Sequence, residues 1–130
     1  MLFVAGLPKP LRILAATVAM CAVASKAAHG QAAADSASAP AIDAGRAIFH
    51  GQGNCQLCHG ANLEGGPIAP TLMAHPWKDA KGGGYIAILN VVSTGAPGTV
   101  MVSHPGGISD EDARRVAAYV WAVSHGKARP

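Results

Sequence analysis

A five-residue segment near the middle of this 130-residue chain limits its possible folds more than any other part. The segment is Cys55-Gln56-Leu57-Cys58-His59, in which two thiols are separated by two residues and a histidine follows directly. Residues three or four apart lie on the same side of a helical turn, so both thiols and the imidazole can face one partner. The segment therefore indicates a site at which three side chains hold a single group.

Four kinds of site use two cysteines at this spacing. A structural zinc site needs four ligands, usually as two pairs, and no second pair of cysteine or histidine residues follows at a suitable distance. A dithiol redox motif is expected in a strand–helix unit and has no use for the histidine, and a plain disulfide would block cofactor attachment until it was reduced. Attachment of a c-type haem uses all three residues, because Cys55 and Cys58 form thioethers with the two vinyl groups and His59 binds the iron. We therefore predict one covalently attached haem c.

The rest of the chain has few large side chains with which to build a core. Half of the residues are hydrophobic, but only 5% are aromatic, and there are 16 glycines and 9 prolines. Small domains of this kind usually need a staple, a metal or a cofactor at their centre. No apolar run reaches the roughly 18 to 20 residues of an ordinary membrane span, which excludes a multi-pass protein.

Residues 1–30 have the pattern of a secretory signal peptide. Lys9 and Arg12 precede an apolar run over residues 13–24. Small residues then recur at a spacing typical of cleavage, and we place the cut before Gln31, with Ala22-Val-Ala24 and Ala32-Ala-Ala34 as alternative cleavage sequences. An uncleaved anchor helix is the alternative.

The signal peptide is followed by a linker and one domain. Residues 31–40 are rich in alanine and serine and are expected to be a flexible linker, and residues 41–130 form the folded domain. The whole chain has 10 basic and 7 acidic residues, but three of the basic ones belong to the signal peptide, so the mature protein is balanced. This balance argues against a nucleic-acid partner. We place the mature protein in the periplasm, without a transmembrane span.

Two helices are predicted at the ends of the domain. Asp43 is expected to cap a first helix that carries Gly45 and Phe49. Ser109 and Asp112 form a capping box at the start of the last helix. The apolar stripe and the stop of this last helix comprise Val116, Tyr119, Val120, Val123, His125, Gly126 and Lys127.

Residues 85–94 fit either a helix or a strand. Their β-branched composition favours a strand, whereas Leu89 and Val92, three residues apart, allow a helix. The turn-rich segments 60–84 and 95–107 are long for a small domain, which is expected only where something fills its centre.

Several segments of the domain match one known family. They are Gly45 with Phe49, Cys55-Gln-Leu-Cys-His-Gly60, Ala69-Pro-Thr-Leu72, the glycine-rich residues 95–101, and Ile108-Ser-Asp-Glu-Asp112 with Val116-Ala-Ala-Tyr119-Val120. Through these segments the chain resembles the class I c-type cytochromes over residues 41–127. The resemblance implies an all-α fold, a small helical shell around one haem in which the first and last helices cross. It also implies a helix for residues 85–94.

The resemblance implies that a methionine is the second axial ligand of the iron. Only Met73 and Met101 remain after removal of the signal peptide. Met101 lies in a loop bounded by glycine and proline, in the position of the family's ligand loop, although Val102 stands where the family often has proline. Met73 is expected to pack near the ring, and His104 is the alternative ligand.

Two further residues are assigned to the site on the same resemblance. The carbonyl of Pro70 is expected to accept the free ring N–H of His59, which fixes the imidazole. Trp77 is expected to donate a hydrogen bond to a haem propionate, or else to form a wall of the pocket. Lys78 is expected to be a solvent-exposed charge.

These features predict an electron-transfer protein and not an enzyme. Iron held by histidine and methionine has no open position for a substrate. The expected role is one-electron transfer from a periplasmic dehydrogenase or another respiratory donor to an oxidase or another acceptor, through an apolar rim near residues 52–57 and 100–105. The expected redox partners are a periplasmic dehydrogenase, an oxidase or a bc-type complex. Residues 63–72 are loosely similar to cytochromes that serve quinoprotein dehydrogenases. The alternatives are a haem subunit of a larger oxidoreductase, or a gas-binding or sensing protein if Met101 is not a firm ligand.

Overall fold

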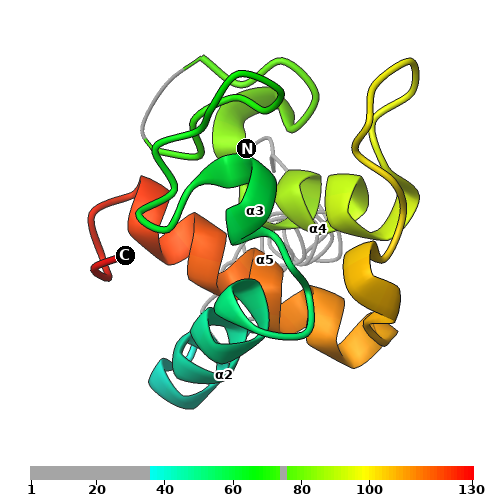
Figure 1. The fold of residues 1–130 in the computed structure, drawn as a ribbon. Coiled ribbons are helices and arrows are strands. Elements are labelled where there is room, and N and C mark those ends of the chain that lie inside the picture. The colour runs from blue at the N-terminus through cyan, green and yellow to red at the C-terminus, as the bar shows by residue number, and fades with distance from the viewer. Residues whose placement is uncertain (1–35, 74–75) are drawn as a thin grey trace, which may run out of the picture. The chain divides into compact units, whose positions relative to one another are not determined.

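The computed structural model describes residues 36–73 and 76–130, all of them in one compact unit of the chain, Ala34–Pro130. The predicted signal peptide and residues 31–35 of the predicted linker lie outside the described residues. Within the described ranges there are helices and no strands, which confirms the all-α fold class (Figure 1). The elements in chain order are α2 (Ala39–His50), α3 (Gln56–His59), the 3₁₀ turn η1 (Lys81–Gly83), α4 (Tyr85–Thr94), the 3₁₀ turn η2 (Pro105–Gly107) and α5 (Asp110–Ser124). None of these described helices is long and apolar enough to cross a membrane.

Helix α2 begins earlier than expected. Its N-terminal flanking residue is Ser38, and Pro40 lies in the first turn, where a missing N–H costs nothing. Asp43, which we expected to cap the helix, lies inside it, with its Oδ1 3.5 Å from Nη1 of Arg46. Ala39 and Pro40, the last two residues of the predicted linker, therefore belong to the helix.

Helices α2 and α5 pack across each other (Figure 1), and Gly45 lies at the point of closest approach. A Cβ atom on Gly45 would overlap the carbonyl oxygen of Arg115 and would lie 2.9 Å from Cβ of Tyr119. One turn further along α2, the rings of Phe49 and Tyr119 meet edge to face with their centroids 5.5 Å apart. Only a residue without a side chain allows the two backbones to come this close.

Residues 85–94 form helix α4, as the resemblance predicts. The helix packs on α5 and buries Tyr85, Ile88 and Val92, which lie on one face. Each β-branched residue lowers helix stability by only about 0.5 kcal/mol. Burying a large apolar side chain contributes about 2 kcal/mol, so packing on α5 outweighs the β-branched composition.

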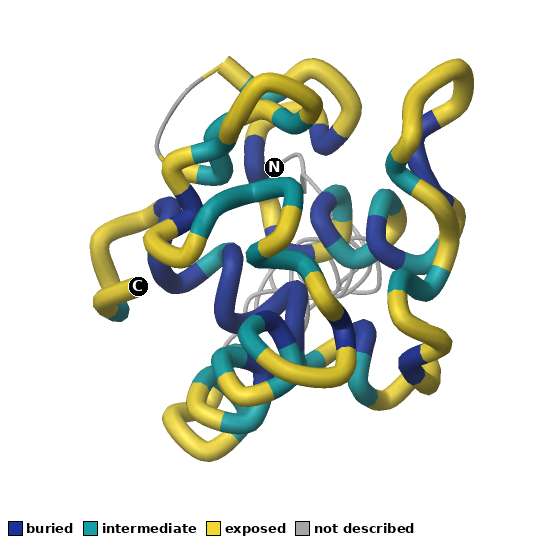
Figure 2. Tube along the Cα trace, in the orientation of Figure 1, coloured by how far each residue is buried: buried dark blue, intermediate teal, exposed yellow. Residues whose placement is uncertain are grey.

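The protein core lies where α5 meets α2 and α4 (Figure 2). Most of α5 is buried, whereas the long segments between the helices are largely exposed. The largest fully buried side chains are those of Tyr119, Phe49, Leu63 and Val116. This core is small, as the scarcity of large side chains predicts.

Helix α5 begins with the predicted capping box. The backbone N–H of Asp112 donates to Oγ of Ser109 over 3.1 Å. In return, Oδ2 of Asp112 accepts from the Ser109 hydroxyl at 2.8 Å and from the Ser109 N–H at 3.4 Å. The hydroxyl of Ser109, together with the nearby Arg115, holds the pKa of the Asp112 carboxyl below its usual value.

Removal of this cap gives a first prediction. Ser109→Ala should lower the free energy of unfolding by about 1 kcal/mol in urea titrations.

Because the pKa of Asp112 is lowered in the folded state, its carboxylate stabilises the protein above the unfolded pKa, and this stabilisation is lost as the pH falls through the folded value. Asp112→Asn should therefore be less stable than wild type at pH 7, and the difference should shrink below about pH 4. If the free energies of unfolding of wild type and Asp112→Asn differ by the same amount at pH 7 and at pH 3, the Asp112 carboxylate does not stabilise the cap.

Candidate functional site

A cavity of about 580 Å³ lies in the described unit, with a mostly apolar lining. This volume is in the range of cofactor sites. Helices α2, α4 and α5 contribute Phe49, Ile88, Val92, Val116 and Val120 to the lining. The long segments after α3 and α4 supply most of the remaining walls. The turn-rich segments 60–84 and 95–107, which are long for a small domain, therefore form walls of this cavity.

The three residues of the motif line the cavity together. Cys55 precedes α3, and Cys58 and His59 lie within this single helical turn. The N–H groups of Cys58 and His59 both donate to the carbonyl of Cys55, over 3.2 and 2.9 Å. The turn thus brings two thiols and one imidazole to the same cavity, as the spacing predicts.

The acidity of Cys55 argues against a dithiol redox motif. Burial raises the pKa of the Cys55 thiol to about 11, and the neighbouring Cys58 contributes to the rise. Catalytic dithiols have the opposite property, a lowered pKa that supplies the reactive thiolate.

His59 is oriented by a backbone carbonyl. Its Nδ1 lies 3.0 Å from the carbonyl oxygen of Pro70, the contact that the resemblance implies. Since a carbonyl can only accept, Nδ1 carries the proton and Nε2 is left with its lone pair. Burial lowers the pKa of His59, and the Pro70 carbonyl partly opposes this. The imidazole is therefore in the neutral form, and the nitrogen that can bind a metal is Nε2.

The segment that carries Pro70 is tied back to α3. The N–H of Gly65 donates to the His59 carbonyl over 2.7 Å, and the N–H of Leu72 donates to the carbonyl of the fully buried Leu63 over 2.8 Å. A Cβ atom on Gly65 would lie 2.7 Å from the carbonyl carbon of Pro70, and its φ is +83°. Glycine at this position lets the chain pass close enough to His59 for the Pro70 carbonyl to reach the ring.

Met101 enters the cavity lining from a different part of the chain. Its loop is fastened to the end of α4, because its carbonyl accepts from the N–H of Ala96 over 2.9 Å. Its own N–H donates to Oγ1 of Thr99 over 3.1 Å. The structure thus brings Met101 to the same cavity as His59.

His104, the alternative ligand, lies elsewhere. Its Nε2 is 2.8 Å from Oδ1 of Asp110 in the first turn of α5, and it is not among the residues that line the cavity. Its backbone N–H donates to the carbonyl of Val92 over 2.9 Å. This placement favours Met101 over His104.

Trp77 lines the cavity and packs against the buried cluster, with its indole nitrogen against Gly83. The exposed Lys78 and Asp79 follow it along the cavity lining. Lys78 is therefore exposed, as expected, and also borders the site. Met73 lies on the same segment but is not in the lining.

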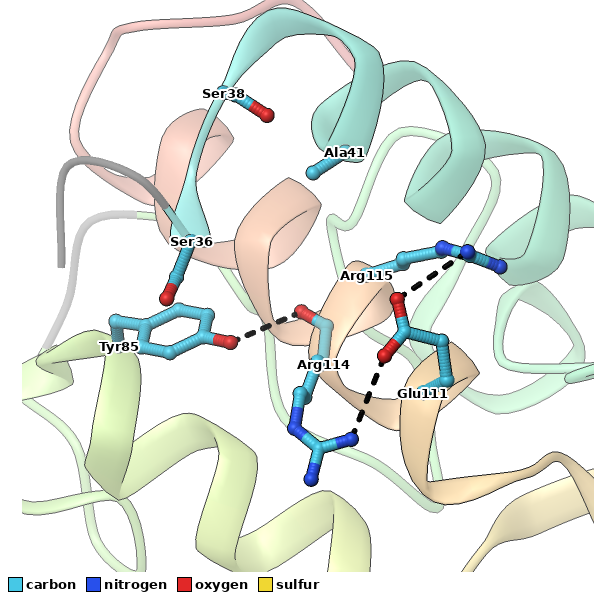
Figure 3. Close-up of a pocket in the computed structure, with 7 residues that line it drawn as sticks. All are labelled: Ser36, Ser38, Ala41, Tyr85, Glu111, Arg114 and Arg115. Carbon is cyan, nitrogen blue, oxygen red and sulfur yellow. Dashed lines mark hydrogen bonds and ion pairs between the residues drawn. The ribbon is translucent and has the colours of Figure 1, made fainter. Parts of the chain in front are cut away.

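A second cavity, of about 260 Å³, lies where the starts of α2 and α4 meet the first turns of α5 (Figure 3). The Glu111 carboxylate lies 3.5 Å from Nη1 of Arg114 and 3.2 Å from Nη2 of Arg115. The hydroxyl of Tyr85 points to the Arg114 carbonyl, 3.5 Å away. Among the described residues that line this cavity there is no cysteine, histidine or methionine that could bind a haem iron.

The zinc alternative has no support in the described ranges. Among residues 36–73 and 76–130, no three histidine, cysteine or acidic side chains are grouped to hold a metal ion.

A helical shell around an apolar cavity, with a Cys-x-x-Cys-His turn in its wall, defines a protein that holds a covalent haem. The model of the Cytochrome c family matches residues 42–124, and the chain belongs to this family. No curated protein and no solved structure matches the chain. The family carries covalently bound haem c, so this is a haem electron-transfer protein.

One set of contacts beside the site was missed by the sequence analysis. The side chain of Gln56 forms hydrogen bonds with both the ring and the backbone carbonyl of His50 at the junction of α2 and α3. Neither residue type has a distinctive spacing in the sequence. The only signal was that a long polar residue, Gln56, stands between the two cysteines.

Proposed function

We propose that this protein is a single-haem periplasmic carrier of one electron. In this proposal Cys55 and Cys58 hold the haem through thioethers, and His59 and Met101 bind the iron. The observation that carries it is that His59 and Met101, from two separately fastened segments, line one apolar cavity. The haem supplies an iron that changes oxidation state by one electron. In this proposal the Pro70 carbonyl orients the neutral imidazole, the apolar lining surrounds the haem, and Met101 leaves no open ligand position.

A carbon monoxide titration tests this proposal. The reduced wild-type protein should not bind carbon monoxide rapidly at neutral pH, because Met101 occupies the sixth position. Rapid stoichiometric binding would favour the gas-binding alternative and would contradict the carrier role.

The attachment residues give a second prediction. Cys55→Ala and Cys58→Ala, expressed in a host competent in cytochrome maturation, should each retain at most one thioether, and the double variant none. Mass spectrometry of the denatured protein measures the added tetrapyrrole directly. If wild type itself carries bare thiols, the proposal fails.

The partners are proposed from the expected location and from the surface. Residues 1–30 are proposed to direct export, so the partners would be redox proteins of the periplasm: a dehydrogenase, an oxidase or a bc-type complex. Around the cavity lies a set of exposed apolar side chains, which we call the apolar collar: Leu57, Ile68, Val100 and Val102, between 61% and 75% exposed. We propose that partners dock on the apolar collar. We further propose that the electron donor is a quinoprotein dehydrogenase, because residues 63–72 are loosely similar to cytochromes that serve such enzymes.

The apolar collar gives a third prediction. Stopped-flow rates of electron transfer to a purified partner should change less than about threefold between low and physiological ionic strength, because docking does not depend on charge pairs. Val100→Ser should slow the reaction, whereas Ile86→Ser should not, since Ile86 is equally exposed (68%) but does not line the cavity. A steep fall with salt, or equal slowing by both variants, would contradict apolar docking.

A further inference from the structure

His50 and Gln56 are joined by two hydrogen bonds. Nε2 of Gln56 donates to the His50 carbonyl over 2.8 Å. Oε1 of the same amide lies 2.9 Å from Nδ1 of the His50 ring. His50 is the last residue of α2 and Gln56 the first of α3, so the two bonds close the connection between these helices.

These bonds determine the proton positions on His50. The backbone carbonyl can only accept, so the amide nitrogen of Gln56 faces it and the amide oxygen faces the ring. Nδ1 of His50 must therefore carry a proton and donate to that oxygen. Its Nε2 is left as an acceptor in the neutral ring.

The free acceptor of His50 faces helix α5. Its Nε2 lies 3.4 Å from the hydroxyl of Tyr119, a side chain with no solvent exposure. Burial raises the pKa of Tyr119, so the phenol keeps its proton and can donate it to His50. The guanidinium of Arg46 lies over the Tyr119 ring, 5.4 Å from its centroid. Each polar atom of the His50 ring thus has a partner on a different element.

The same contacts reach the proximal side of the haem site. The Gln56 carbonyl accepts from the N–H of Gly60 over 2.9 Å. This hydrogen bond joins the residues at the two ends of the turn that contains His59. Fixing the Gln56 side chain on α2 therefore fixes the first residue of this turn. Leu57, next in the chain, is exposed and cannot do so.

We propose that His50 and Gln56 form a clasp that positions the proximal ligand His59, and that Tyr119 fastens this clasp to the crossing of α2 and α5. The clasp rests on the proposed role of His59 as iron ligand. The imidazole of His59 is then held in two ways: the Pro70 carbonyl binds its Nδ1, and the clasp fixes the backbone turn that carries it. An electron carrier benefits because its ligand then moves little between oxidation states.

Two measurements on the holoprotein test the clasp. Gln56→Ala should speed hydrogen exchange of the amides of residues 57–60 about tenfold, because the turn loses the hydrogen bonds that protect it from local opening. It should also shift the paramagnetically displaced ring signals of His59 in the ferric protein. Tyr119→Phe keeps the packed ring and should give a smaller change of the same kind. Gln52→Ala, an exposed glutamine in the same connection, is the matched control and should change neither.

The outcomes separate the clasp from general stability and from the proposed function. If Gln56→Ala does not fold, His50→Phe keeps a ring beside Phe49 and Tyr119 but removes both nitrogens, and should give the same two changes. If Gln56→Ala speeds hydrogen exchange throughout α2 and α5 but leaves the His59 ring signals unmoved, the clasp is overturned. It is also overturned if Gln56→Ala and Gln52→Ala give the same exchange rates and the same His59 signals. If wild type lacks displaced His59 signals, the ligand assignment fails, whatever the exchange rates show.

Discussion

Met101→Ala should abolish the weak near-infrared iron–sulfur charge-transfer band of the ferric protein. The band requires a thioether on the iron, and within the described cavity lining Met101 is the one methionine. The reduced variant should also bind carbon monoxide stoichiometrically, because the sixth position is opened. Its reduction potential should fall, since a soft thioether favours ferrous iron.

Two control variants make this result specific. Met73→Ala removes a methionine that is partly exposed and does not line the cavity, and should keep the band. His104→Ala should also keep it, because the ring of His104 faces Asp110. A band that survives in Met101→Ala and disappears in either control would falsify the assignment of Met101.

Gly45→Ala should lower the free energy of unfolding by about 2–3 kcal/mol, or prevent accumulation of the holoprotein. Alanine is the better helix former by about 1 kcal/mol, so helix propensity alone would predict a gain. The new methyl group overlaps the carbonyl oxygen of Arg115, and a backbone atom cannot move aside as a flexible side chain can. Urea titration of the purified protein measures the difference.

Gly84→Ala is the matched control for this prediction. Its φ is −69°, and a Cβ atom there meets nothing within 4 Å. Gly84→Ala should lower the free energy of unfolding by less than about 1 kcal/mol, the cost of a less favourable residue at a helix N-terminus. Equal losses in the two variants would mean that the crossing of α2 and α5 is not the cause.

Much of the fold could be predicted because local signals and burial agree. The capping box at Ser109 and Asp112 needs only residues within one turn, and it forms as predicted. Helix α4 could not be assigned from its composition, because its packing on α5 decides between helix and strand; the family resemblance supplied that information. The predicted start of α2 was wrong, because Pro40 is equally typical of a linker and of a first helical turn.

The candidate site was predictable where sequence neighbours act together. The positions of Cys55, Cys58 and His59 on one turn follow from their spacing. The approach of Pro70 to His59 was expected only from the resemblance, because it depends on how the intervening loop folds. The clasp of His50 and Gln56 was missed, since it requires two side chains of ordinary type to meet across a connection whose path the sequence does not fix.

The crossing at Gly45 joins the first described helix of the domain to its last. Loop-closure entropy must be overcome across nearly the whole domain before these two helices gain from their contact. A chain that ends before α5 lacks the surface on which Phe49 is buried, so its N-terminal portion has nothing to dock on. Folding is therefore expected to wait until synthesis and delivery of the C-terminal helix are complete, and a premature stop codon anywhere before that helix should leave a fragment for proteolysis rather than a smaller working protein.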